Sequence, residues 1–150
     1  ATYITKYDLM DPQAGNIDGA GRRNFNNIGV SSPELRANLG LAWKNDIHAA
    51  NVFLRYISSY DDDQNCDDGT ANLGGCAGGF YEVDSHLTVD AQYNIDLGGL
   101  YDTEQSYVLT LGAINMFDEE PPQLFTNSGF DSKVHDPRGR QIYARLAIEF

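Results

Sequence analysis

The residues best suited to chemistry are two cysteines, three histidines and a run of carboxylates. Asp84, Ser85 and His86 place a carboxylate, a nucleophile and a base side by side. Successive side chains of a strand point to opposite faces, so Ser85 would point away from both of its neighbours. His48, His86 and His135 are scattered, and no phosphate-binding glycine loop followed by lysine occurs. The sequence therefore predicts no catalytic site, no metal site and no cofactor.

The cysteines, Cys66 and Cys76, lie close together in a segment rich in aspartate and glycine. Their spacing predicts one disulfide, formed in an oxidising compartment, with a structural rather than a redox role. The carboxylates from Asp61 to Asp68 are also oxygen ligands of the kind that Ca²⁺ prefers. The glycine in this segment is out of register for an EF-hand loop, and no distal glutamate follows. Solvated loop charge is therefore preferred, with calcium binding as the alternative.

Composition excludes some partners and leaves others open. The net charge is -12 and the pI is about 4.3, whereas binding of nucleic acid requires a basic surface. Only 41% of the residues are hydrophobic, and no apolar run approaches the roughly 20 residues of a membrane helix. The mean hydropathy of -0.43 suits a soluble protein. It equally suits a sheet whose strands alternate between lipid-facing and lumen-facing residues.

Apolar and polar residues alternate over six segments, which predicts an all-β, antiparallel fold. The segments are 1–7, 34–44, 47–57, 81–97, 107–116 and 142–150. Long loops at 8–33, 58–79 and 117–139 alternate with short turns at 44–46 and 98–106. Outer-membrane barrels have short periplasmic turns and longer extracellular loops. The pattern therefore predicts strands of a transmembrane β-barrel.

The last segment places Ile142, Ala144, Leu146, Ile148 and Phe150 on one face and ends the chain on an aromatic residue. This ending resembles the signal by which the barrel assembly machinery recognises outer-membrane proteins. The residues expected to carry that signal are Tyr143, Leu146, Ile148 and Phe150.

Three stretches carry a more specific resemblance. They are Asn-Met-Phe-Asp-Glu-Glu-Pro-Pro at 115–122, Asp-Pro-Arg-Gly-Arg at 136–140 and the ending at 143–150. Together they resemble the C-terminus of TonB-dependent outer-membrane receptors. Residues 33–38, leading into a strand with Trp43, and residues 55–60 add to the likeness, which covers essentially the whole chain.

Membership of that family would imply a barrel of about 22 strands, of which residues 1–150 are the last six. The plug domain and the earlier strands would then lie outside this chain. A complete small barrel is the weaker reading, because closure needs about 8 strands.

The resemblance implies a receptor in the outer membrane of a Gram-negative bacterium that takes up a scarce nutrient. The nutrient class is a ferric siderophore, cobalamin or a glycan. Implied partners are outer-membrane lipid, the barrel assembly machinery and, through the absent N-terminal part, the TonB complex. The alternative is a soluble, secreted, acidic β-sandwich that acts as a binding module.

Aromatic residues of the long loops are candidates for stacking on a ligand, with loop packing as the alternative: Tyr60, Phe80, Phe125 and Phe130. Charged residues of the polar face are candidates for a substrate path, although pairing with each other or with the plug is preferred. They are Arg36, Arg55, Glu82, Asp84, His86, Asp90 and Arg145.

Deleting Phe150 should impair insertion of the intact protein, because the chain would lose its aromatic end. Immunodetection in purified outer membranes measures the effect. Unchanged levels of the deletion variant would count against an assembly signal at this end.

Overall fold

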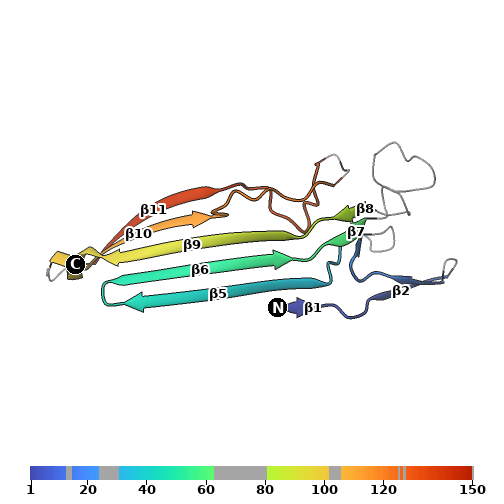
Figure 1. Cartoon of the computed structure of the whole chain (residues 1–150), viewed down its shortest axis with the longest axis horizontal. Helices are drawn as coiled ribbons and strands as arrows, with labels where there is room; N and C mark the ends of the chain where they lie inside the picture. Colours follow the sequence, from blue (N-terminus) through green and yellow to red (C-terminus); the bar gives the residue numbers. More distant parts are fainter. Residues whose placement is uncertain are drawn as a thin grey trace. The chain divides into compact units, whose positions relative to one another are not determined.

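The computed structural model describes residues 1–12, 15–23, 31–62, 81–101, 106–124, 126 and 128–149. Its largest element is a six-stranded sheet with the order β1-β5-β6-β9-β10-β11 (Figure 1). The strands are β1 (Thr2–Tyr3), β5 (Leu35–Asn45), β6 (His48–Ile57), β9 (His86–Asp96), β10 (Ser106–Ile114) and β11 (Gln141–Glu149). The pairings β1–β5, β9–β10 and β10–β11 are antiparallel, which confirms the all-β, antiparallel prediction.

The shorter strands form two further sheets, mainly within segments predicted to be loops. The hairpin of β2 (Asp8–Asp11) and β3 (Gly15–Asp18) is antiparallel. The other sheet has the order β4-β7-β8, with β4 (Arg22–Arg23), β7 (Tyr60–Asp62) and β8 (Tyr81–Val83). In it, β4 runs parallel to β7. The prediction of loop throughout 8–33 was therefore wrong, because local composition does not reveal pairing with a distant strand.

The prediction of a single strand over 81–97 was also wrong, because this segment forms two strands, β8 and β9 (His86–Asp96). β8 pairs with β7, so that Val83 lies opposite Tyr60, whereas β9 belongs to the six-stranded sheet. Asp84 and Ser85 lie between the two strands and are exposed. Leu97 begins a short helix, α1 (Leu97–Tyr101). Alternation of apolar and polar side chains indicates an extended backbone, but it does not indicate where the chain changes from one partner strand to another.

Asp96, the last residue of β9, caps the N-terminus of helix α1. The amide of Gly99 donates to the Asp96 carboxylate at 3.2 Å, as an N-cap residue requires. A Cβ at Gly99 would lie 2.7 Å from Ile47, so glycine allows this close approach. In the part of the chain that the structure describes, no helix has the length and apolar character needed to cross a membrane.

The chain divides into two compact units. Unit 1 comprises Ala1–Ala37, Tyr56–His86 and Glu120–Pro137, and unit 2 comprises Asn38–Arg55, Leu87–Glu119 and Arg138–Phe150. The buried apolar cluster found among the described residues lies in unit 1 and consists of Tyr60, Val83 and Leu124. Unit 2 instead leaves large apolar side chains of its strands exposed.

Glycines opposite aromatic residues interlock neighbouring strands of unit 2. Gly112 on β10 lies directly opposite Tyr143 on β11, and a Cβ at Gly112 would overlap the tyrosine ring. The ring lies across the glycine and its hydroxyl donates to Gln92 at 3.1 Å. Likewise, the ring of Phe53 would lie 3.2 Å from a Cβ at Gly40. Such pairs cover a glycine in a strand and help to fix the register.

Replacing Gly112 with Ala should destabilise the sheet by about 1 to 3 kcal/mol, because the methyl group overlaps the Tyr143 ring. The loss should largely disappear in a Tyr143→Ala background, where the space is free. Denaturant unfolding of the four proteins of this cycle measures the coupling. Equal losses in both backgrounds would contradict the interlock.

Candidate functional site

One face of the unit 2 sheet is apolar and exposed. Residues directly opposite in a ladder share a face, and Leu111 lies opposite Tyr93 and Ala144, while Leu109 lies opposite Ile95 and Leu146. The alternating strand pattern extends this face across β5, β6, β9, β10 and β11. Its large side chains that are exposed are Leu39, Leu41, Trp43, Leu87, Tyr93, Leu111, Ile142, Leu146 and Ile148.

Small residues make a shallow hollow of about 650 Å³ in this apolar face. Ala50, Ala91, Ala113 and Ala144 line it from four neighbouring strands, with Leu111 among the larger side chains. A polar contact remains on the same face, where the Tyr93 hydroxyl lies 2.6 Å from Nδ1 of His48. The face otherwise offers apolar contact.

The opposite face of the sheet carries hydrogen-bonded polar side chains. Asn94 accepts from Thr110 at 2.7 Å and from Gln92 at 3.1 Å. Thr110 lies opposite both Asn94 on β9 and Arg145 on β11. The two faces of the same strands therefore differ in chemistry, as the sequence alternation predicts.

In unit 2, hydrogen bonds to Asp90 connect the residue that follows β10 to β9. Arg55 donates to Asp90, which also accepts from the Asn115 amide at 3.0 Å. Asn115 has a left-handed φ of 49°, which asparagine tolerates better than most residues. Its side chain accepts from the Glu119 amide and donates to the Glu119 carbonyl, both at 2.9 Å. Of the charged residues considered for a substrate path, Arg55 and Asp90 thus pair with each other.

In unit 1, opposite charges face each other across the parallel pair β4–β7. Arg22 is aligned with Asp61 and Arg23 with Asp62. The Arg23 guanidinium lies 2.7 Å from the Asp62 carboxylate, which is fully buried. Burial raises the pKa of Asp61, and the positive charge of Arg22 partly opposes this shift. The aligned opposite charges favour the pairing of these two short polar strands.

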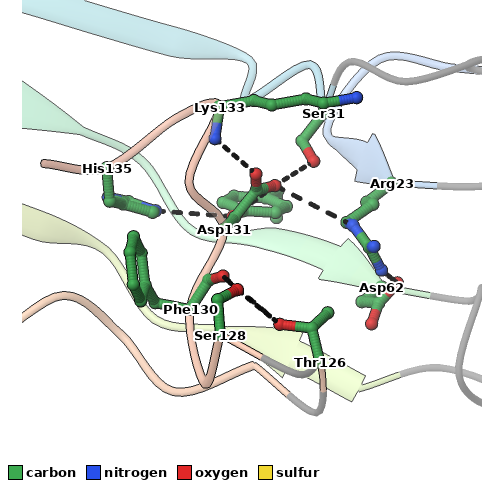
Figure 2. Close-up of polar contacts among 10 residues, drawn as sticks. Arg23, Ser31, Asp62, Thr126, Ser128, Phe130, Asp131, Lys133 and His135 are labelled. Atoms are coloured by element: carbon green, nitrogen blue, oxygen red, sulfur yellow. Dashed lines mark hydrogen bonds and ion pairs between the residues drawn. The ribbon is translucent and has the colours of Figure 1, made fainter. Parts of the chain in front are cut away.

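Asp131 joins three segments of unit 1 through its carboxylate (Figure 2). The hydroxyl of Ser31 donates to Oδ2, and the Tyr60 hydroxyl lies 3.3 Å from the same atom. The amide of Lys133 donates to Oδ1 at 3.0 Å, while Nε of Arg23 lies 3.9 Å from Oδ2. Asp131 is 6% exposed, so these donors stabilise a buried charge.

Two buried histidines extend this group of contacts. The Tyr60 hydroxyl lies 3.4 Å from Nε2 of His135, and Nδ1 of His135 lies 3.3 Å from Nδ1 of His86. Burial, strengthened by the negative charge of Asp131, raises the pKa of Tyr60. Burial, strengthened by His86, lowers the pKa of His135 to about 4. Tyr60 and His135 are therefore both neutral at pH 7.

Tyr60 and Phe130 are the two candidate ligand-contacting residues that the structure describes. Tyr60 is 2% exposed, so the chain's own residues cover its ring, which packs in the buried cluster with Val83 and Leu124. Phe130 is half-buried, and its carbonyl accepts from Ser128 at 2.7 Å. Phe80 and Phe125, together with the expected disulfide of Cys66 and Cys76, lie outside the described residues.

The assembly residues lie on β11 as far as the structure describes them. Leu146 and Ile148 lie on the apolar face, and Tyr143 covers Gly112 on the polar face. Phe150 lies outside the described residues. Whether these side chains direct assembly stays a prediction.

The contacts of Asp131 were not foreseen from the sequence. Ser31 and Asp131 are 100 positions apart, and His86 and His135 are 49 apart, so no local motif links them. Within the described ranges, no group of three or more histidine, cysteine, aspartate or glutamate side chains is placed to hold a metal ion. Ser31 is buried and bonded to a carboxylate, and His135 contacts Tyr60 and His86. The arrangement is suited to fastening segments together.

Replacing Arg23 with Met should destabilise unit 1 by about 3 to 5 kcal/mol, because the buried carboxylate of Asp62 would lose its guanidinium. The double variant with Asp62→Leu should recover part of the loss. Hydrogen exchange of the Asp61 amide, which donates to the Gly21 carbonyl, reports this stability. As a control, Lys6→Met removes an exposed ion pair with Asp8 and should leave this exchange unchanged. Equal effects of the two single variants would contradict a structural role for the buried pair.

Comparison with known proteins gives no relative: no family model, no curated protein and no solved structure matches this chain.

Proposed function

We propose that the chain is the C-terminal part of the barrel of a TonB-dependent receptor, which takes up a scarce nutrient across a Gram-negative outer membrane. The observation that carries the proposal is the two-faced sheet of unit 2. One face exposes large apolar side chains such as Leu41 and Leu111, and the other carries the hydrogen-bonded set around Asn94. This division is typical of a barrel strand between lipid and lumen.

Strand length supports the same proposal. β5 and β9 each have 11 residues, β6 has 10, and β10 and β11 each have 9. A tilted strand crosses a bilayer in about 9 to 11 residues. Ordinary strands of globular proteins have about 5 or 6 residues. The five long strands that lie side by side in the sheet therefore favour a membrane barrel over a secreted β-sandwich.

The connections between these strands also fit the proposal. Asp46 and Ile47 alone link β5 to β6, and the segment with α1 links β9 to β10. The segments between β6 and β9 and between β10 and β11 are longer. Short links on the periplasmic side and longer ones outside are usual in outer-membrane barrels.

In this proposal, different parts of the chain contact lipid, the assembly machinery and the ligand. The apolar face of unit 2 contacts outer-membrane lipid, and the closing strand is recognised by the barrel assembly machinery. The segments 8–33, 58–79 and 117–139 help to hold the ligand, a ferric siderophore, cobalamin or glycan. Energy from the TonB complex reaches the receptor through its N-terminal part. The resemblance noted in the sequence supports these partner assignments.

Two lysine substitutions on β10 test which face meets lipid. Leu111→Lys places a charge among exposed apolar side chains and should cost about 2 to 4 kcal/mol if that face meets the bilayer. Val108→Lys is the matched control, because Val108 lies opposite Asp96 on the polar side of the same strand. The amount of each intact variant in purified outer membranes should be low for Leu111→Lys and near normal for Val108→Lys. Equal amounts of both would count against the lipid assignment.

A nutrient screen tests the transport function separately. A strain lacking the intact protein should lose uptake of one radiolabelled ferric siderophore, cobalamin or glycan, and a protonophore should abolish that uptake in the parent strain. Normal uptake of every compound would oppose the receptor assignment. A monodisperse protein without detergent would instead support the soluble binding module.

A further inference from the structure

We propose that His86 and His135 form an acid-released latch that fastens the segment 128–137 to the rest of unit 1. The latch is a one-way chain of hydrogen bonds that ends on the Asp131 carboxylate. Figure 2 shows the part of this chain between His135 and Asp131. It concerns the folding of unit 1 on itself and does not depend on the transport function proposed above.

The direction of the chain follows from what each group can donate. The Asp131 carboxylate only accepts, so the Tyr60 hydroxyl must give its proton to Oδ2, 3.3 Å away. The oxygen of Tyr60 can then only accept from His135, whose Nε2 lies 3.4 Å away. His135 therefore carries its proton on Nε2 and keeps a lone pair on Nδ1. That lone pair accepts from Nδ1–H of His86 at 3.3 Å.

Protonation of His135 reverses this last contact. The added proton can bind only to Nδ1, so His86 keeps this contact only by moving its own proton from Nδ1 to Nε2. The ring centroids are 5.1 Å apart, and both rings are buried. The closed segment therefore disfavours a proton that an exposed histidine would accept near pH 6.5.

The charged groups that act on His135 and on the neighbouring Tyr60 lie on several segments of unit 1. Asp131 favours protonation of His135, whereas His86 and the positive charge of Arg36 oppose it. Arg23 and Asp62 act on the neighbouring Tyr60. The sum of these effects and burial lowers the pKa of closed His135 to about 4.

The sign of the pH dependence follows from these values. Above pH 6.5 neither the closed nor the open segment binds this proton, so the latch is fully stable. Between pH 6.5 and about 4, only the open segment binds it, so acid favours opening. From pH 7 to pH 5 the equilibrium between open and closed forms should shift about 20-fold toward the open form.

Hydrogen exchange of the intact protein tests the latch. The amides of Val134 and His135 donate to the Asp131 carbonyl at 3.1 and 2.9 Å, and both exchange when the segment opens. After correction for the intrinsic rate, their protection should fall about 20-fold from pH 7 to pH 5. The Met116 amide, which donates to Val89 within unit 2, is the internal control and should stay within twofold.

A variant that cannot titrate completes the test. His135→Gln keeps a side-chain N–H for Tyr60 but has no pKa in this range, so its protection should not depend on pH. An equal loss of protection in this variant would overturn the proposal, as would constant protection in the native protein. If the variant does not fold, NMR titration of ¹³C-labelled histidine in the native protein decides. A ring of His135 that titrates near pH 6.5 without any opening contradicts the latch.

Discussion

The antiparallel ladder of unit 2 is the constraint on which the rest of its surface depends. Each strand points successive side chains to opposite faces, so the register decides which residues share a face. A slip of one residue would mix the Leu111 face with the Thr110 face. Gly112 and Tyr143 oppose such a slip, because the ring fits only over a residue without Cβ. The apolar surface and its alanine-lined hollow are therefore consequences of backbone pairing.

Unit 1 is held by polar contacts to an unusual degree. Its apolar cluster is small, and the Arg23–Asp62 pair and the hydrogen-bond donors to Asp131 lie beside it. A buried polar network stabilises only when its donors and acceptors match, which makes it selective for one arrangement. Segments with the composition of loops are thereby placed at defined positions. The same selectivity makes a change of one proton at His135 consequential.

Prediction from sequence succeeded where structure depends on local periodicity. The bounds expected for β5, β6, β10 and β11 agree with the structure to within one or two residues at each end. It failed at 81–97, where alternation continues from β8 through β9 although the two pair with different strands. Tyr60 was expected on an outer loop and lies in the core, because β7 packs against β8. None of these contacts has a local signal.

The sequence by itself determined the all-β class, the long strands and the chemical difference between their two faces. These properties follow from side-chain alternation along an extended backbone, which is local in the chain. Only the tertiary structure decided that β4 lies parallel to β7, that Ser31 meets Asp131 and that His86 meets His135. Such partners are separated by tens of residues, so they depend on how the chain returns and packs, and a local pattern cannot encode that path.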